Sequence, residues 1–435
     1  MGATNRAPHS RMHGARDADN RYRGHPRRQP RTQMDHTTHK VLHLIPSFGL
    51  GGAECLTAEI AAAQQRQGLC QPFVFAWHHD GPVHDRLRVS HVAALAVESR
   101  RRSGISCLLL VSDLVARALA IARTVLSRHT EIIHAHMCDS GAIALLVGRF
   151  LRRAVVVTEH SPSPFPPQCH PGSLEYAWRS FILGWTYQHV DAVIAVSAEI
   201  AEVLRDRFGV PGAKLRTIIS GTPSSSDRFG DVSPRLPDGL EHGTRRITCV
   251  GRLVASKNQA ALIRTLPRLV VEHPPLRLVL VGDGPDQGVL EELAESLGIR
   301  RHVIFLGART DVSAILRASD CFVTASLHEG TSVALLEAME QGLPVVATFS
   351  RGNAAVLEDG AGWIVDADAP DKLAAAISAV LLDPELANTL SAAARNSAQH
   401  YYTLDRVIRE LQTLYDEVGT RRDGQPLPAL RAVST

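Results

Sequence analysis

A chain of 435 residues with 45% hydrophobic and 21% charged residues is long enough for two globular domains with full cores. Its formal net charge of only +3 argues against a dedicated nucleic-acid-binding protein, so we expect no nucleic-acid partner. The seven cysteines are scattered singly, without zinc-site spacing, as small core residues of a reducing compartment would be. We therefore expect a cytoplasmic protein.

The first 39 residues differ from the rest of the chain. Eight arginines are interleaved with His, Gly, Pro and Asn, and no apolar run could form the core of a signal peptide. We predict a disordered basic segment that is a candidate for peripheral contact with anionic lipid at the inner face of a membrane. We favour two plainer alternatives: an extension without a role, or a start codon placed too early, because Met34 stands just ahead of the first strand.

From Lys40 onward, short apolar runs alternate with amphipathic helices, which is typical of parallel sheets built from βαβ units. The apolar stretch 107–126 is interrupted by Asp113, Arg117 and Arg123, so it predicts a core helix and not a membrane span. Strands are predicted at 41–45, 72–76, 92–97, 131–135, 154–158, 192–196 and 214–219.

Glycines and histidines follow the ends of several of these strands. Gly51 and Gly52 stand in a turn between strand and helix, where glycine lets the backbone approach a ligand at the carboxyl edge of the sheet. His134 and His136 alternate along one strand and so point to the same face, and His160 ends the next strand. The plain alternative for each histidine is a hydrogen-bonded residue near the core.

A composition shift divides the chain. Residues 220–244 are rich in Gly, Pro and Ser without periodicity, which indicates an interdomain linker. After it the alternation resumes, and Arg252 and Lys257 lie in a strand-to-helix loop at the ligand edge. Strands are predicted at 246–250, 278–281, 303–307, 320–325, 343–347 and 363–365, helices at 259–272 and 370–382, and a disordered tail at 419–435.

Two carboxylates, Glu329 and Glu337, bracket a loop that turns into a helix at Gly330 or Thr331. A hydroxyl of Thr331 or Ser332 is expected to cap that helix, whose free amides and positive dipole end favour a phosphate. Carboxylates accept hydrogen bonds from neutral hydroxyls, so acids beside an anion site suggest a ligand with both phosphate and hydroxyl groups. A nucleotide sugar has both.

The segment from His328 to Met339 resembles the E-x7-E signature of the retaining glycosyltransferases of family 4. The sequences Gly251-Arg252-Leu253, Lys257-Asn258, Gly282-Asp283-Gly284-Pro285 and Gly352-Asn353-Ala354-Ala355-Val356 are similar to further motifs of that family. The resemblance covers nearly all of 40–418 and is strongest over 246–382. It fails at 219–223, where the family has Pro-Asn-Gly and only Gly221 is kept, so Ser220 receives no role.

The resemblance implies an α/β protein with the GT-B fold, in which two Rossmann-like domains have parallel sheets that face a central cleft. An acceptor-binding domain would span 40–219, the linker 220–244, and a nucleotide-sugar-binding domain 245–400. The helix at 401–418 would pack back on the first domain.

The resemblance also implies residue roles. Arg252 and Lys257 would clamp the diphosphate, Glu329 would hold the transferred sugar, and His160 would face that sugar from the other domain. The remaining donor-binding candidates are Gly51, Gly52, Gly251, Gly282, Gly284, Leu306, Gly307, Arg309, Gly330, Thr331, Ser332 and Glu337, while His136 and Asp139 are weaker acceptor-side candidates. We expect no metal-binding Asp-x-Asp triplet at a strand end, so the cations at the diphosphate should be Arg and Lys side chains. We therefore expect neither a metal nor a cofactor, and the nucleotide sugar is substrate.

The expected activity is metal-independent transfer of a sugar from a nucleotide sugar to a hydroxyl of a glycan or lipid-linked acceptor, in bacterial polysaccharide or glycolipid synthesis. Two alternatives stay open: a nucleotide-sugar epimerase of the same fold, and a non-catalytic protein that binds sugar nucleotides or glycans.

Overall fold

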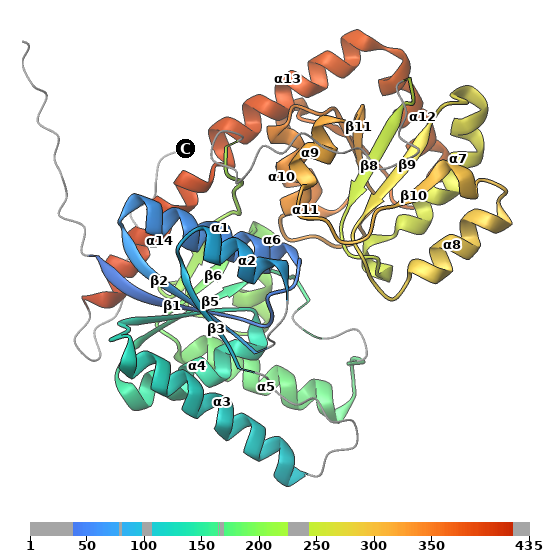
Figure 1. Cartoon of the computed structure of the whole chain (residues 1–435). Helices are drawn as coiled ribbons and strands as arrows, with labels where there is room; N and C mark the ends of the chain where they lie inside the picture. Colours follow the sequence, from blue (N-terminus) through green and yellow to red (C-terminus); the bar gives the residue numbers. More distant parts are fainter. Residues whose placement is uncertain are drawn as a thin grey trace, which may run out of the picture. The chain divides into compact units, whose positions relative to one another are not determined.

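The computed structural model describes residues 38–77, 81–97, 107–163, 165, 169–224 and 243–420. Two parallel β-sheets, each covered by helices on both faces, make up this part of the chain (Figure 1). The strands are buried apolar runs, as expected for parallel sheets enclosed between helices. All thirteen predicted strands are confirmed to within a few residues at each end.

The first sheet has the order β3-β2-β1-β4-β5-β6-β7, with every neighbouring pair parallel. Helices α3, α4 and α5 pack on one face of it, and α1, α2 and α14 pack on the other (Figure 1). The strands are β1 (His39–Ile45), β2 (Cys70–Ala76), β3 (Ala93–Ala96), β4 (Ile132–His136), β5 (Ala154–Glu159), β6 (Ala192–Ala195) and β7 (Leu215–Thr217). The helices are α1 (Gly52–Gln67), α2 (Pro82–Val89), α3 (Cys107–Ser127), α4 (Cys138–Leu151), α5 (Leu174–His189), α6 (Ala198–Glu202) and the π-helical η1 (Val203–Arg207).

The second sheet has the order β10-β9-β8-β11-β12-β13 and is also wholly parallel. Its strands are β8 (Arg246–Val250), β9 (Arg277–Val281), β10 (Val303–Phe305), β11 (Cys321–Thr324), β12 (Val345–Thr348) and β13 (Trp363–Val365). Its helices are η2 (Ala255–Lys257), α7 (Gln259–Glu272), α8 (Gln287–Ser296), η3 (Arg300–His302), α9 (Val312–Arg317), α10 (Val333–Glu340), α11 (Arg351–Val356), η4 (Glu358–Gly360), α12 (Pro370–Leu382) and α13 (Pro384–Tyr401).

Each sheet has one point at which its strand order reverses. In the first sheet the reversal lies between β1 and β4, and in the second it lies between β8 and β11. The loops that leave such neighbouring strands diverge to opposite faces and open a crevice at the carboxyl edge. Both reversal points therefore mark places where a ligand can approach the backbone.

The last helix, α14 (Leu404–Gly419), returns to the first sheet. Leu404, Val407, Ile408, Leu411 and Tyr415 share one buried cluster with residues of β1 and α1. The chain segments that lead into and out of the second domain meet where Thr222 N donates to Tyr402 O at 2.8 Å and Leu404 N donates to Thr222 O at 3.0 Å.

Gly221 is the one residue kept from the family motif at this crossing, and its backbone explains why. A Cβ added there would lie 2.5 Å from the carbonyl oxygen of Thr403. Any side chain would push the two crossing segments apart.

Several predictions fall partly or wholly outside the described residues. These are the basic segment before residue 38, the linker between 224 and 243, and the tail after residue 420. The domain boundaries stay predictions. In the described part of the chain no single helix is long and apolar enough to cross a membrane, although α12 and α13, bent by 100°, pass that test as a pair on length and composition alone.

Candidate functional site

The loops that follow β8 and β11, the two strands at the reversal point of the second sheet, are joined by an ion pair. Lys257 Nζ donates to Glu329 Oε1, and both side chains are largely buried. The loops are also tied by a backbone bond from Leu327 N to Ser256 O at 2.9 Å. An ammonium and a carboxylate that converge at this edge place one donor group and one acceptor group where a ligand would enter.

Arg252 lies in the same loop as Lys257 and is exposed. Its main-chain carbonyl accepts from Gln259 Nε2 at 2.9 Å, which fixes the loop to the start of α7. The guanidinium favours the ionised form of Glu54, a carboxyl of α1 whose pKa is nevertheless raised by burial. A residue of the first domain therefore faces the cation of the second.

Glu54 follows the Gly51-Gly52 turn and was not among the predicted site residues. Its carboxyl group folds back over the start of α1, and a Cβ added to Gly51 would lie 2.0 Å from Glu54 Oε2. A side chain at residue 51 would therefore require the Glu54 carboxylate to move. Gly52 is nearer the second domain, since its Cβ would lie 3.9 Å from Val333 Cγ2.

Gly330 follows Glu329 and makes a close approach to the first domain. A Cβ at this position would lie 2.8 Å from Ile200 Cδ1 and 2.9 Å from the carbonyl oxygen of His160. A Cβ on Gly352 would lie 2.3 Å from the carbonyl oxygens of both Glu329 and Gly330. The backbone around Glu329 is thus held between two neighbouring segments with no room for side chains.

The start of α10 differs from the sequence prediction. The helix begins at Val333, and Ser332 is its cap, with Ser332 Oγ accepting from Leu335 N at 3.4 Å. A start at Gly330 or Thr331 was wrong because the Thr331 hydroxyl donates to Val196 O of the first domain at 2.6 Å. That contact between the domains cannot be read from local sequence.

Glu337 lies on α10, half-buried, two turns after Glu329. Its charge acts on Cys55 of α1, whose pKa is raised to about 12, mainly by burial. The charges of Glu337 and Glu54 thus both reach Cys55 near the start of α1.

The glycines after β8 and β9 serve loop packing. A Cβ on Gly282 would lie 2.1 Å from Gly251 O, and one on Gly284 would lie 2.2 Å from Leu253 O. Gly282 N donates to Gly307 O at 2.8 Å, which links the same edge to β10. Their contact with a donor stays a prediction.

The family resemblance also implies that Leu306, Gly307 and Arg309 line a nucleobase pocket, and Gly307 is the residue that accepts from Gly282. Leu306 packs with Val279, Val281 and Ile315, and the Arg309 guanidinium donates to both carboxyl oxygens of Asp311 at 2.8 and 2.7 Å. Arg309 is therefore already engaged by a carboxylate, and its role at a base stays a prediction.

Four histidines of the first domain form a row that ends at His160. His43 Nδ1 lies 3.1 Å from His136 Nε2, and His136 Nδ1 lies 3.3 Å from His160 Nε2. His134 stacks on His136 with ring centroids 4.3 Å apart, as expected from their shared face. Burial lowers the pKa of His43 and of His160 to about 4, so the row is neutral at physiological pH.

Gln64 sets the direction of the hydrogen bonds along this row. Its side-chain oxygen faces His43 Nε2 at 3.1 Å, so His43 donates from Nε2 and accepts at Nδ1. His136 must then donate from Nε2 to His43, and His160 from Nε2 to His136. The Nδ1 atom of His160 is left as a hydrogen-bond acceptor.

Nitrogen atoms of His43, His134 and His136 lie within 4.8 Å of one another, a spacing that invites comparison with a metal site. Both nitrogens of His134 are engaged, one with the Tyr415 hydroxyl and one with Thr158 Oγ1, each at 2.7 Å. To bind a metal ion, His134 would have to give up one of these two hydrogen bonds. These residues therefore fit a hydrogen-bonded row better than a metal centre.

The expectation that no Asp-x-Asp triplet stands at a strand end was wrong, because Asp366 and Asp368 follow β13 directly. Asp366 accepts from Lys372 Nζ at 2.8 Å, which lowers the pKa of that carboxyl. The triplet lies at the outer strand of the sheet, two strands from β11. It is separate from Lys257 and Glu329, and the expectation of a site without metal stays a prediction.

Asn353 on α11 has a fully buried side chain, and its amide oxygen lacks a hydrogen-bond donor among the described residues. Its amide nitrogen donates to Thr348 O at 3.1 Å, but its side-chain oxygen has no partner among the described residues. A buried acceptor without a partner is costly unless water or a ligand satisfies it. The sequence motif that begins with Gly352-Asn353 drew attention to this residue, but it did not predict that the side-chain oxygen would lack a partner.

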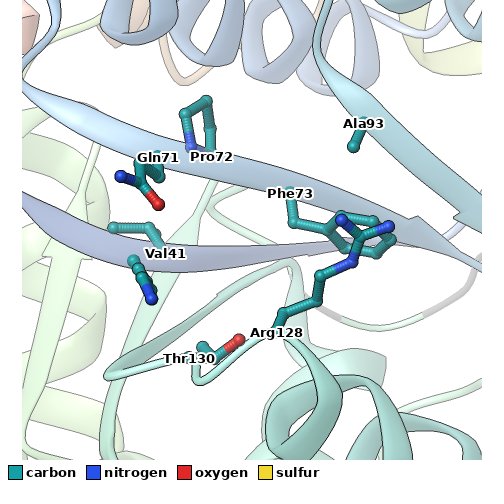
Figure 2. Close-up of a pocket in the computed structure, with 8 residues that line it drawn as sticks. Val41, Gln71, Pro72, Phe73, Ala93, Arg128 and Thr130 are labelled. Carbon is teal, nitrogen blue, oxygen red and sulfur yellow. The ribbon is translucent and has the colours of Figure 1, made fainter.

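A small hollow lies at the opposite, amino-terminal edge of the first sheet. Figure 2 shows it lined by the first residues of β1, β2 and β3, with Arg128 over the ring of Phe73 at 4.7 Å from its centre. None of the predicted site residues lines it. The candidate site is therefore the set of loops at the carboxyl edges.

Comparison with known proteins identifies the family to which both halves of the chain are similar. The family described as "Glycosyl transferases group 1" matches residues 237–397, and the one described as "Glycosyltransferase Family 4" matches residues 50–224. The putative glycosyltransferase EpsD of Bacillus subtilis is 28% identical over 66% of this chain and 76% of its own length. A mannosyltransferase of Mycolicibacterium smegmatis, GDP-mannose-dependent and acting on phosphatidylinositol monomannoside, is 33% identical over 48% of this chain and only 57% of its own length.

Solved structures have the same fold. HepE of Anabaena, in complex with UDP and glucose, superposes with a TM-score of 0.72 at 19% identity, over 87% of this chain and 99% of that one. WaaG, a glycosyltransferase of lipopolysaccharide biosynthesis, gives a TM-score of 0.63 at 16% identity, over 86% and 99%. The predicted GT-B fold is confirmed, and the chain belongs to the family 4 glycosyltransferases.

Proposed function

We propose that this glycosyltransferase is a metal-independent enzyme that moves a sugar from a nucleotide sugar to a hydroxyl acceptor with retention of anomeric configuration. The observation that carries the proposal is the Lys257–Glu329 pair, which spans the reversal point of the second sheet. A cation and an acceptor held together at this edge match a ligand that has phosphate and hydroxyl groups side by side.

The donor would be held mainly by the second domain. Lys257 spends one of its three N–H groups on Glu329 and keeps two for phosphate oxygens, and the exposed Arg252 adds a forked cation. The amides of 330–332 add dipole stabilisation at the start of α10. Glu337 would accept from ribose hydroxyls, and Glu329 from hydroxyls of the transferred sugar.

His160 would contact the sugar from the first domain. It lies against Gly330, and its neutral ring offers an acceptor nitrogen to a sugar hydroxyl. In transfer, the bond between the anomeric carbon and the diphosphate oxygen breaks with its electron pair going to phosphate. The acceptor oxygen bonds to that carbon on the same face, and its proton goes to the leaving phosphate.

The acceptor would be a glycan or a lipid-linked sugar of a bacterial polysaccharide or glycolipid pathway, with the enzyme in the cytoplasm and in peripheral contact with the membrane. The names of several relatives support an acceptor of this class, among them the phosphatidylinositol monomannoside mannosyltransferase and WaaG. HepE with UDP and glucose supports a nucleotide-sugar donor.

A screen of purified full-length protein against UDP-, GDP- and ADP-sugars, with and without a chelator, tests the proposal through release of nucleoside diphosphate. Release from one donor that survives the chelator and needs an acceptor is expected. Conversion of the sugar with no acceptor present would indicate an epimerase, and loss of release on chelation would contradict metal independence. Inversion at the anomeric carbon of the product would contradict retention.

A further inference from the structure

Helix α5 carries large apolar side chains on the side that faces away from the sheet. Leu174, Trp178, Phe181 and Trp185 are 91%, 64%, 64% and 44% exposed. Their spacing of four, three and four residues places them in one stripe along the helix. Two tryptophans and a phenylalanine in one exposed stripe are unusual on a surface that only meets water.

The opposite side of α5 is already packed on the core. Leu183 and Tyr187 are buried there, and the Tyr187 hydroxyl donates to Glu159 Oε2 at 2.7 Å. The helix is thus apolar on both sides, whereas an ordinary surface helix is apolar only toward the core. The outer stripe is not part of the buried core among the described residues.

The exposed stripe continues onto the neighbouring helices. α4 lies between α3 and α5 on this face of the sheet (Figure 1) and exposes Leu146 by 54% and Phe150 by 85%. On α3, Val115, Leu119 and Leu126 are exposed and share one side of the helix. We call the α5 stripe together with Leu146 and Phe150 the apolar face.

The charges around the apolar face are mainly positive. Asp113 and Glu175 are each neutralised by an arginine of the same helix, Arg117 at 2.6 Å and Arg179 at 2.8 Å. Arg123, Arg149 and Arg152 are exposed on or just after α3 and α4.

This charge distribution decides between two occupants. A second copy docked by a two-fold axis would bring this arginine-bearing surface against itself, which like charges oppose. An anionic lipid surface satisfies both the aromatic stripe and the arginines.

We propose that the apolar face is a membrane-docking surface, on which α5 lies in the plane of an anionic bilayer with its aromatic stripe among the acyl chains. α5 follows β5 and the segment that contains His160, so docking would place a lipid-linked acceptor beside the site. This use of the surface rests on the function proposed above, whereas the binding itself does not.

The test compares two double variants of the full-length protein in flotation with vesicles. Trp178→Ser with Phe181→Ser removes the centre of the stripe. Val271→Ser with Leu382→Ser is the matched control, because Val271 and Leu382 are 80% and 67% exposed on α7 and α12 of the second domain. Both pairs are exposed, so neither should unfold the protein.

We expect wild type and control to bind vesicles of phosphatidylglycerol and phosphatidylcholine, and the stripe variant to bind at least tenfold more weakly. Quenching of tryptophan fluorescence by brominated lipid should fall in parallel. No binding by wild type, or equal binding by all three proteins, would overturn the proposal. A wild-type dimer that the stripe variant abolishes, seen by light scattering without vesicle binding, would assign the face to a second copy.

Release of nucleoside diphosphate with a soluble acceptor separates the two proposals. The stripe variant should match wild type in this assay, because the substituted side chains lie outside the site. If no donor is turned over by any protein, the vesicle result still stands on its own.

Discussion

The two domains approach the candidate site with different chemistry. The second domain offers charge, with Lys257, Glu329 and Arg252 on loops held tight by glycine contacts. The first domain offers neutral polar groups, a row of buried histidines whose proton positions are set by Gln64. Charge suits a fixed diphosphate, while neutral groups suit hydroxyls that differ from one acceptor to another.

The rigidity of the two sides differs as well. Glycines after β8 and β9 leave no space between the loops, which holds the charged side in one geometry. The histidine row depends on hydrogen-bond direction, so it can respond to pH and to a single changed amide. Four experiments test this difference between the two domains.

The largest expected effect follows loss of the cation at the reversal point. Lys257→Ala should lower kcat/KM for the donor by about a hundredfold to a thousandfold, the usual cost of removing a group that stabilises developing charge. Lys372→Ala is the control, since Lys372 is also in an ion pair but is 68% exposed on α12. Equal rates for the two variants, both verified as folded, would remove Lys257 from the site.

The second effect concerns the pH dependence of stability. His43 has a folded pKa of about 4 against 6.5 when unfolded, so the unfolded chain binds the proton more readily. The contribution of His43 to the free energy of unfolding is therefore complete above pH 6.5. It is lost as the pH drops toward 4, which lowers the stability by up to about 3 kcal/mol.

Urea unfolding at pH 7.5, 6 and 5 measures this slope. The lowered pKa values of Asp311 and Asp366 on the second domain act only at still lower pH, whereas the raised pKa of Glu54 acts with the opposite sign and partly offsets the slope from the histidine row. Constant stability over this range, or a His43 resonance that titrates near 6.5, would contradict a neutral row.

The third effect tests the close approach of Gly330 to the first domain. Gly330→Ala would force a Cβ to within 3 Å of Ile200 and of the His160 carbonyl, so kcat/KM should fall at least tenfold. Gly288→Ala on α8 is the control, because nothing lies within 4 Å of its Cβ. An active Gly330→Ala enzyme would show that the two segments need not meet in this way.

The smallest effect concerns the Thr331 hydroxyl. Thr331→Val keeps the shape but removes the bond to Val196 O, which should cost about 0.5–1.5 kcal/mol and a few-fold in rate. Thr331→Ser should restore most of the loss. If Ser and Val behave alike, the hydroxyl bond has no role and only the shape matters.

Local sequence predicted the strands and the loops that carry Lys257 and Glu329. It did not predict which residues of the first domain those loops would contact. Apolar runs at 41–45 and 246–250 identified strands because parallel sheets bury both faces. The capping hydroxyl was narrowed to Thr331 or Ser332, and only the distant Val196 carbonyl decides between them. Glu54 and Gln64 were missed because their roles depend on residues far away in sequence.

The return of α14 to the first sheet has a consequence for how this protein can be made and divided. The cluster that joins β1, α1 and α14 contains residues from Val41 to Val418, so the first domain is not a continuous stretch of chain. During synthesis its core stays incomplete until the second domain has emerged, which leaves apolar surface open for most of translation. A fragment that ends at the linker would lack this helix, and expression of the first domain alone should require residues 404–419 to be supplied with it.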